Sequence, residues 1–186
     1  MKTITALLVL ITALAITSCE GPMGPPGIPG QDGDSFIGTV FEIQGDFTSG
    51  NNYSLFYEFP SNFEIYDTDV VLVYILWEQS NGTDVWRLMP QTVVLKTINA
   101  NYPETDVIQY NFDYTVFDVQ IFLETTMDYN DLLPGETDNQ IFRIVVLPAD
   151  FLAKKSVDIN DINTVIRNPE LHLNIMNNFS AGEITE

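Results

Sequence analysis

Apolar and polar residues alternate with a period of two along long stretches of this chain, and this pattern restricts the fold more than any other feature. In the clearest stretch, 108–116, isoleucine, valine and aromatic residues occupy the even positions and polar residues the odd ones. Such alternation is typical of a strand with one face in the core. Val116 and Phe117 are both apolar, and the apolar face is then carried by the odd positions Phe117, Val119, Ile121 and Leu123. This change of phase predicts a bulge, or a strand that crosses from one sheet to another.

Two runs, 70–77 and 141–147, are apolar at nearly every position and rich in β-branched residues, which predicts central strands. Segments 36–43, 53–59 and 85–95 predict further strands. Turn residues separate these strands, and Asn81-Gly82 predicts the tip of a hairpin.

The last part of the sequence changes pattern. Asp158 is placed to cap a helix, an isoleucine and valine stripe follows it, and Pro169 is placed to end it. Leu171, Leu173 and Ile175 alternate with polar residues and predict an edge strand. We therefore predict an all-β fold, a β-sandwich of about seven strands with one short C-terminal helix.

Few residues of this chain could support catalysis. Cys19 is the single cysteine and His172 the single histidine, which excludes an internal disulfide, a redox-active thiol pair and a zinc site of several His or Cys ligands. The chain contains no Gly-x-Ser-x-Gly elbow and no Gly-x-Gly-x-x-Gly loop. We therefore expect a protein that is not an enzyme.

The first 18 residues have the layout of an export signal, with one cation at Lys2 and an apolar stretch over 6–16. That stretch is shorter than the ~20 residues of a membrane-spanning helix. The run Ile16-Thr17-Ser18-Cys19 resembles the lipobox of bacterial lipoproteins. The resemblance implies cleavage before Cys19 and a diacylglyceryl group on its sulfur; the alternative is an ordinary thiol after an ordinary secretory signal. A lipoprotein carries at least two acyl chains, which hold a protein stably on a membrane.

Glycine recurs at every third position from Gly21 to Gly33, with four prolines between, and this is a collagen-like Gly-x-y register. We interpret 19–34 as the lipidated cysteine followed by a semi-rigid spacer, which would reach about 40 Å in the polyproline II conformation. The alternative is a short trimeric stalk. So few triplets bury little surface, so we favour a monomer.

The remaining sequence is of single-domain length, and we predict a β-sandwich domain over 35–176 and a flexible tail over 177–186. The whole chain has a formal charge of −19, from 7 cations and 26 acids. Loss of residues 1–18 removes Lys2 and no acid, which leaves 6 cations against 26 acids and a charge of −20. A chain this acidic repels nucleic acid, so we expect no nucleic-acid partner.

Two kinds of binding site can be placed on the sequence. Trp86, close to the predicted turn, and Trp77 are candidate stacking faces for a glycan. A strand-core role is the competing interpretation for both. The acids Asp128, Asp131, Glu136 and Asp138 fall within one loop and supply the hard oxygen ligands that calcium prefers, although their spacing is not that of an EF-hand.

Nearly the full length resembles a set of Gram-negative lipoproteins with a collagen-like start. The residues that carry the resemblance are Ser18-Cys19-Glu20-Gly21-Pro22, the glycine triplets and segments such as 69–74 and 140–146. It implies a lipid anchor in the cell envelope, with the outer membrane favoured because Glu20 is not aspartate, and it implies no activity. We therefore expect a non-enzymatic structural or interaction module, or alternatively a glycan-binding surface lipoprotein, whose partners are the membrane and an envelope protein or glycan.

Overall fold

The computed structural model describes residues 36–97, 104–154 and 157–180. The chain divides into two units, Met1–Asp32 and Gly33–Glu186, and every described residue belongs to the second. The predicted signal peptide, Cys19, the Gly-x-y spacer and the last six residues of the predicted tail lie outside the described residues.

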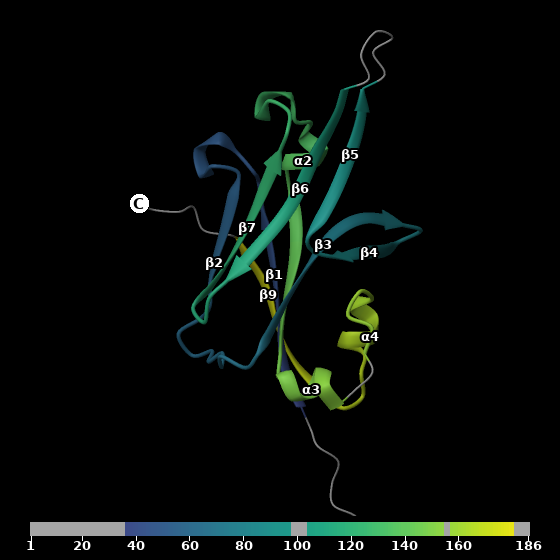
Figure 1. The fold of residues 1–186 in the computed structure, drawn as a ribbon. Coiled ribbons are helices and arrows are strands. Elements are labelled where there is room, and N and C mark those ends of the chain that lie inside the picture. Colours follow the sequence, from purple (N-terminus) through teal and green to yellow (C-terminus); the bar gives the residue numbers. More distant parts are fainter. Residues whose placement is uncertain (1–35, 98–103, 155–156, 181–186) are drawn as a thin grey trace, which may run out of the picture. The chain divides into compact units, whose positions relative to one another are not determined.

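Within those ranges nine strands form two sheets (Figure 1), which confirms the predicted all-β sandwich with more strands than expected. The first sheet has the order β4-β3-β8-β1-β9 and consists of β1 (Phe36–Gly45), β3 (Val70–Ser80), β4 (Thr83–Leu88), β8 (Gln140–Leu147) and β9 (Leu171–Ser180). The second has the order β2-β7-β6-β5 and consists of β2 (Ser54–Glu58), β5 (Gln91–Thr97), β6 (Glu104–Tyr114) and β7 (Asp118–Thr125). Neighbouring strands are antiparallel, except that β9 runs parallel to β1 at the edge of the first sheet.

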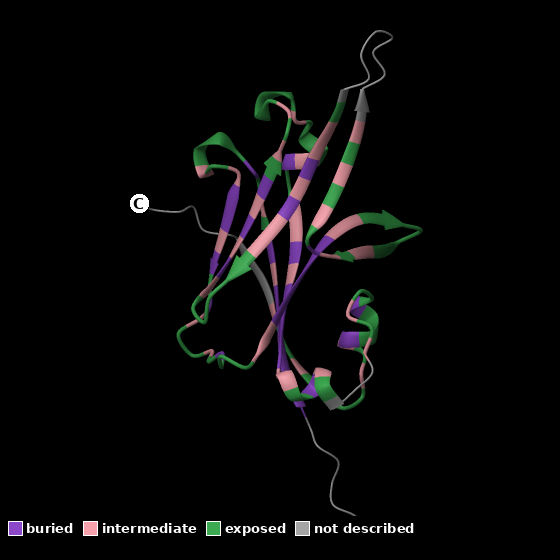
Figure 2. Cartoon of the chain, viewed as in Figure 1, coloured by how far each residue is buried: buried purple, intermediate pink, exposed green. Residues whose placement is uncertain are grey.

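The main hydrophobic core lies between the two sheets. Alternate residues of each strand supply it, including Phe41 of β1, Val73 of β3, Ile108 of β6, Ile121 of β7 and Phe142 of β8, all fully buried. Figure 2 shows that burial is concentrated in the strands and that the loops at both ends are exposed. The period of two in the sequence therefore corresponds to one face in this core and one face outside it.

A second hydrophobic core covers part of the other face of the first sheet, which explains why β3 and β8 are apolar at nearly every position. Two short helices, α3 (Ala149–Lys154) and α4 (Ile162–Ile166), contribute Phe151 and Val165 to it. Tyr74 of β3 belongs to this core, and its hydroxyl donates a 2.6 Å hydrogen bond to the carbonyl of Ile159. That bond satisfies a polar group that burial would otherwise leave without a partner.

The short helical turns η1 (Ser49–Asn51), η2 (Tyr129–Asp131) and α2 (Pro134–Thr137) lie in loops. Figure 1 shows α2 at the end of the sandwich opposite α3. The predicted hairpin tip is confirmed between β3 and β4, where Asn81 and Gly82 have φ angles of 52° and 76°. Both angles are in the left-handed region that a two-residue turn between right-twisted strands requires.

The bulge or sheet crossing predicted at Val116-Phe117 is wrong. Residues 115–117 form the turn between β6 and β7, closed by a 2.9 Å hydrogen bond from the Thr115 amide to the Asp118 carbonyl. The apolar positions change phase because the chain reverses direction within one sheet. Phe117 is 72% exposed at this turn.

Two other boundaries differ from the sequence prediction. Segment 85–95 is two strands in different sheets, β4 and β5, with Pro90 between them; proline lacks the N–H that a continuous ladder needs. The last helix is capped by Asp161 and not by Asp158, because the side chain of Asp161 accepts a hydrogen bond from the amide of Asn163. Strand β9 also continues to Ser180, into the first residues of the predicted tail.

Candidate functional site

The two tryptophans proposed as stacking faces lie on opposite faces of the β3–β4 hairpin. Trp77 packs against the core between the sheets, and Trp86 packs against the second core. The guanidinium carbon of Arg87 lies 3.9 Å from the ring centroid of Trp77, and that of Arg143 lies 4.0 Å from the ring centroid of Trp86. Each indole therefore has a cation over one of its two faces, and a sugar ring cannot stack on that face while the arginine occupies it.

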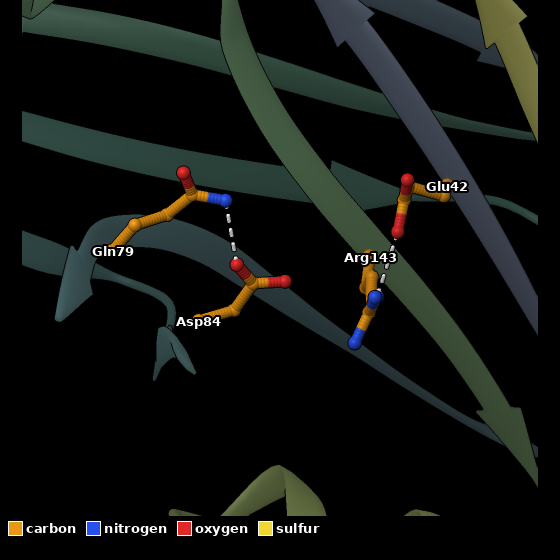
Figure 3. Close-up of polar contacts among 4 residues, drawn as sticks. All are labelled: Glu42, Gln79, Asp84 and Arg143. Atoms are coloured by element: carbon orange, nitrogen blue, oxygen red, sulfur yellow. Dashed lines mark hydrogen bonds and ion pairs between the residues drawn. The ribbon is translucent and has the colours of Figure 1, made fainter. Parts of the chain in front are cut away.

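Arg143 also forms an ion pair on the outer face of the first sheet. Its Nε donates a 2.8 Å hydrogen bond to Oε2 of Glu42, the residue directly opposite on β1 (Figure 3). Within the β3–β4 hairpin, Nε2 of Gln79 donates a 2.8 Å hydrogen bond to Oδ1 of Asp84, its directly paired residue (Figure 3). These contacts connect neighbouring strands and give each of the four side chains a polar partner within the sheet.

The four acids proposed for calcium follow each other along η2 and α2. Asp128 accepts from the amide of Asn130, Oε2 of Glu136 accepts from the amide of Leu133, and Oδ1 of Asp138 accepts from the Thr137 hydroxyl. The bonds to Asp128 and Glu136 cap short helical turns, and the bond to Asp138 joins two adjacent side chains. Within the part of the chain that the structure describes, no group of three or more His, Cys, Asp or Glu side chains is placed to hold one metal ion.

An open recess of about 890 Å³ lies where the loop after β2 meets the β6–β7 turn. It is lined by residues 58–65 together with Val116 and Phe117. The amide of Phe59 donates a 2.8 Å hydrogen bond to the carbonyl of Phe117, which fixes the loop against the turn. We call this the turn recess.

The aromatic floor of the turn recess is anchored in the main core. The ring centroids of Phe59 and Phe63 are 5.4 Å apart, and that of Phe63 lies 5.0 Å from Phe41 in an edge-to-face arrangement. Phe41 is fully buried in β1. Aromatic contacts of this geometry add to the burial energy and so stabilise the loop against β1.

Two carboxylates, those of Glu58 and Glu64, line the turn recess. Glu58 is exposed at the end of β2, and its directly paired neighbour across the strands is Asp118 of β7. Oε2 of Glu64 accepts a 3.3 Å hydrogen bond from the Tyr66 hydroxyl. The lining residues include these two glutamates and no lysine or arginine, so the recess is an acidic and aromatic surface.

A second recess, of about 520 Å³, lies on the other side of Phe63 and Glu64, which line both. Its walls include Tyr66 and Ile37, exposed to 59% and 63%, and the acids Asp69 and Asp150. We call it the sheet recess. The two recesses are thus adjacent, with the Phe63-Glu64 segment as their common wall.

Sequence reasoning missed both recesses. The available signal was the run 59–66, which is rich in aromatic residues but does not alternate, together with an apolar pair at Val116-Phe117. Apolar residues without strand periodicity belong either to a core loop or to an exposed surface, and only the fold distinguishes the two.

The tyrosines with raised pKa values are outside the recess linings: burial raises the pKa of both Tyr57 and Tyr110 to about 12.

The predicted lipidation site, Cys19, lies outside the described residues. Among the helices of the described ranges, none has the length and apolar character needed to cross a membrane. Comparisons of the chain with protein-family models, curated proteins and solved structures find no match.

Proposed function

We propose that this chain is a non-enzymatic interaction module of the bacterial cell envelope, held to the outer membrane by lipid on Cys19 and raised from it by the Gly-x-y spacer. The observation that carries the binding role is the turn recess, an open cavity of about 890 Å³ beside a phenylalanine that is 72% exposed. A large aromatic side chain exposed to water beside an open recess is typical of a binding surface.

The anchor is supported by the lipobox-like run before Cys19 and by the absence of any other cysteine in the sequence. Replacement Cys19→Ser should move the protein from the membrane fraction to the soluble fraction of the envelope. Mass spectrometry of the mature N-terminus should find acyl chains on the natural protein and none on the variant. A natural protein with a free thiol would contradict the anchor.

The binding role can be tested in intact cells with a photo-reactive phenylalanine analogue at position 117. The matched control is the same analogue at Leu133, which is 64% exposed and directly precedes α2. Figure 1 shows α2 at the end of the sandwich opposite the turn between β6 and β7. We expect position 117, and not position 133, to cross-link to one envelope component. Equal labelling at both positions, or none at either, would contradict specific binding at the turn recess.

A glycan is the alternative partner. Its support is the combination of aromatic rings with the Asn62 amide and the Glu58 and Glu64 carboxylates in the turn recess, groups that stack on and hydrogen-bond to sugars. Since arginines occupy one face of Trp77 and of Trp86, this binding would use the turn recess in place of the tryptophans.

A further inference from the structure

We infer that the partner of the turn recess is a protein, which presents a basic, extended segment whose lysine or arginine side chain enters the recess. This inference rests on the proposed function, because it names the class of ligand for the same site. It follows from three features of the described residues: an uncompensated row of acids, aromatic walls, and the adjacent sheet recess.

The first feature is a row of like charges across the second sheet. Glu58 lies directly opposite Asp118, and Asp113, which pairs with Gln120, is the diagonal neighbour of Asp118. Like charges at directly paired positions destabilise a sheet. Asp118 accepts a hydrogen bond from the Thr115 hydroxyl, which is a neutral group and leaves the negative charge in place. A cation bound beside Glu58 would relieve this repulsion.

The second feature is the combination of these acids with aromatic walls. Phe59, Phe63 and Phe117 all line the turn recess. Lysine and arginine have apolar stems that pack on such rings, and their charged ends are attracted to the ring faces and to carboxylates. Glu64, which accepts a hydrogen bond from the Tyr66 hydroxyl, also lines the turn recess and offers a carboxylate beside these rings.

The third feature, the adjacent sheet recess, favours a ligand of extended shape. The sheet recess also contains acids, Asp69 and Asp150, and its lining includes no lysine or arginine. Because Phe63 and Glu64 separate the two recesses, an extended segment lying over this wall would place one side chain in each. A neutral glycan would gain nothing from the excess of negative charge, and so the peptide is favoured.

The test uses the full chain purified from membranes in mild detergent and a fluorescein-labelled octapeptide of alternating lysine and leucine. The first control peptide has glutamine in place of lysine, and the second probe is a labelled neutral hexasaccharide. The site variant is Glu58→Gln/Glu64→Gln. The matched variant is Glu78→Gln/Asp84→Asn, which removes the same charge from exposed positions of the β3–β4 hairpin.

We expect the lysine octapeptide to bind the natural chain, to bind the site variant about tenfold more weakly, and to bind the matched variant with nearly unchanged affinity. Binding should weaken with added salt. A third variant, Phe117→Ser, changes an exposed residue and should also weaken binding while the unfolding midpoint stays the same. If the site variant and the matched variant lose affinity for the octapeptide equally, the effect arises from the net charge of the chain, and the inference is overturned.

Two outcomes separate this inference from the proposed function. In the first outcome, the lysine octapeptide does not bind, but the hexasaccharide binds at the recess or photo-cross-linking at position 117 captures a component. The inferred ligand class is then wrong, while the proposed binding role of the turn recess is still supported. If the octapeptide binds as expected but position 117 captures nothing in cells, the proposed function fails although the recess recognises basic side chains.

Discussion

The guanidinium group of Arg143 lies over the indole ring of Trp86, with its central carbon 4.0 Å from the ring centroid. The same group donates a hydrogen bond to Glu42, so one side chain of β8 connects β4 to β1 across the outer face of the first sheet. Both members of the ion pair are only about one quarter exposed, at 26% and 30%. A partly shielded cation between an aromatic face and a carboxylate is a stabilising arrangement.

Replacement Arg143→Met should lower the free energy of unfolding by about 1 kcal/mol, because it keeps the apolar stem and removes both polar contacts. The measurement is urea denaturation of the natural chain, Arg143→Met, Glu42→Gln and the double variant. The two single losses should add to more than the loss in the double variant, because they share one interaction. Full additivity would show that Arg143 and Glu42 act independently.

Tyr110 should make the protein sensitive to alkali. Its hydroxyl donates a 2.9 Å hydrogen bond to the Glu136 carbonyl, and burial, with a smaller contribution from the charge of Glu136, raises its pKa to about 12. The unfolded chain has a tyrosine pKa of about 10. The neutral form is therefore favoured by folding, and this stabilisation is complete below about pH 10 and is lost as the pH rises from there to about 12.

The variant Tyr110→Phe should lose about 1 kcal/mol at neutral pH, where the hydrogen bond is missing, and its unfolding free energy should fall less steeply above about pH 10. Urea denaturation at a series of pH values measures both effects. Part of the slope should remain in the variant, since burial also raises the pKa of Tyr57 and Tyr74. An unchanged slope would mean that Tyr110 ionises without unfolding the chain.

Gly45, at the end of β1, lies close to the side chain of Leu55. A Cβ atom at this position would lie 2.6 Å from one Leu55 methyl carbon and 3.1 Å from the other. Leu55 is buried between the sheets and has little room to move. We expect Gly45→Ala to lower the unfolding free energy by about 1–3 kcal/mol, as overpacked core substitutions do.

The double variant Gly45→Ala/Leu55→Val should recover part of that loss, because the shorter side chain removes the contact that causes it. Differential scanning calorimetry of the three variants tests this. If the losses of the single variants add without recovery, the effect of Gly45→Ala arises from the backbone of β1 and not from Leu55.

Substitution of Asp128 tests whether this residue caps a helical turn or binds calcium. Its Oδ1 accepts hydrogen bonds from the Asn130 amide, at 2.9 Å, and from the Asn130 side chain, at 2.8 Å. If this capping role dominates, Asp128→Ala should cost about 1 kcal/mol in buffer with a calcium chelator. The natural chain and the variant should then show the same thermal midpoint with and without calcium chloride.

A calcium-dependent rise in the midpoint of the natural chain that Asp128→Ala abolishes would favour the loop site of Asp128, Asp131, Glu136 and Asp138. Replacement Asp106→Asn, of an acid on β6 that accepts a bond from the Thr126 hydroxyl, is a matched control for the loss of one charge. It should leave any calcium response unchanged.

The class of fold and several local features follow from the order of residues alone. Alternation over 108–114 specifies a half-buried strand in any all-β protein, and Asn81-Gly82 specifies a two-residue turn because both residues tolerate the left-handed conformation that the turn requires. These are properties of adjacent residues, so short-range reasoning finds them. The export signal and the lipobox-like run before Cys19 are equally local, and they remain predictions about residues outside the described ranges.

The sheet that each strand joins, and the contacts of its outer face, depend on how the whole chain packs. Local pattern does not distinguish a bulge from a chain reversal at Val116-Phe117, because both shift the apolar positions by one residue. The turn recess combines Glu58 and Phe63 with Phe117 from a hairpin far along the chain, and Arg143 reaches Trp86 only because β3 lies between β8 and β4. Such contacts depend on the order of strands, which is selected by the packing of two whole sheets and not by any single segment.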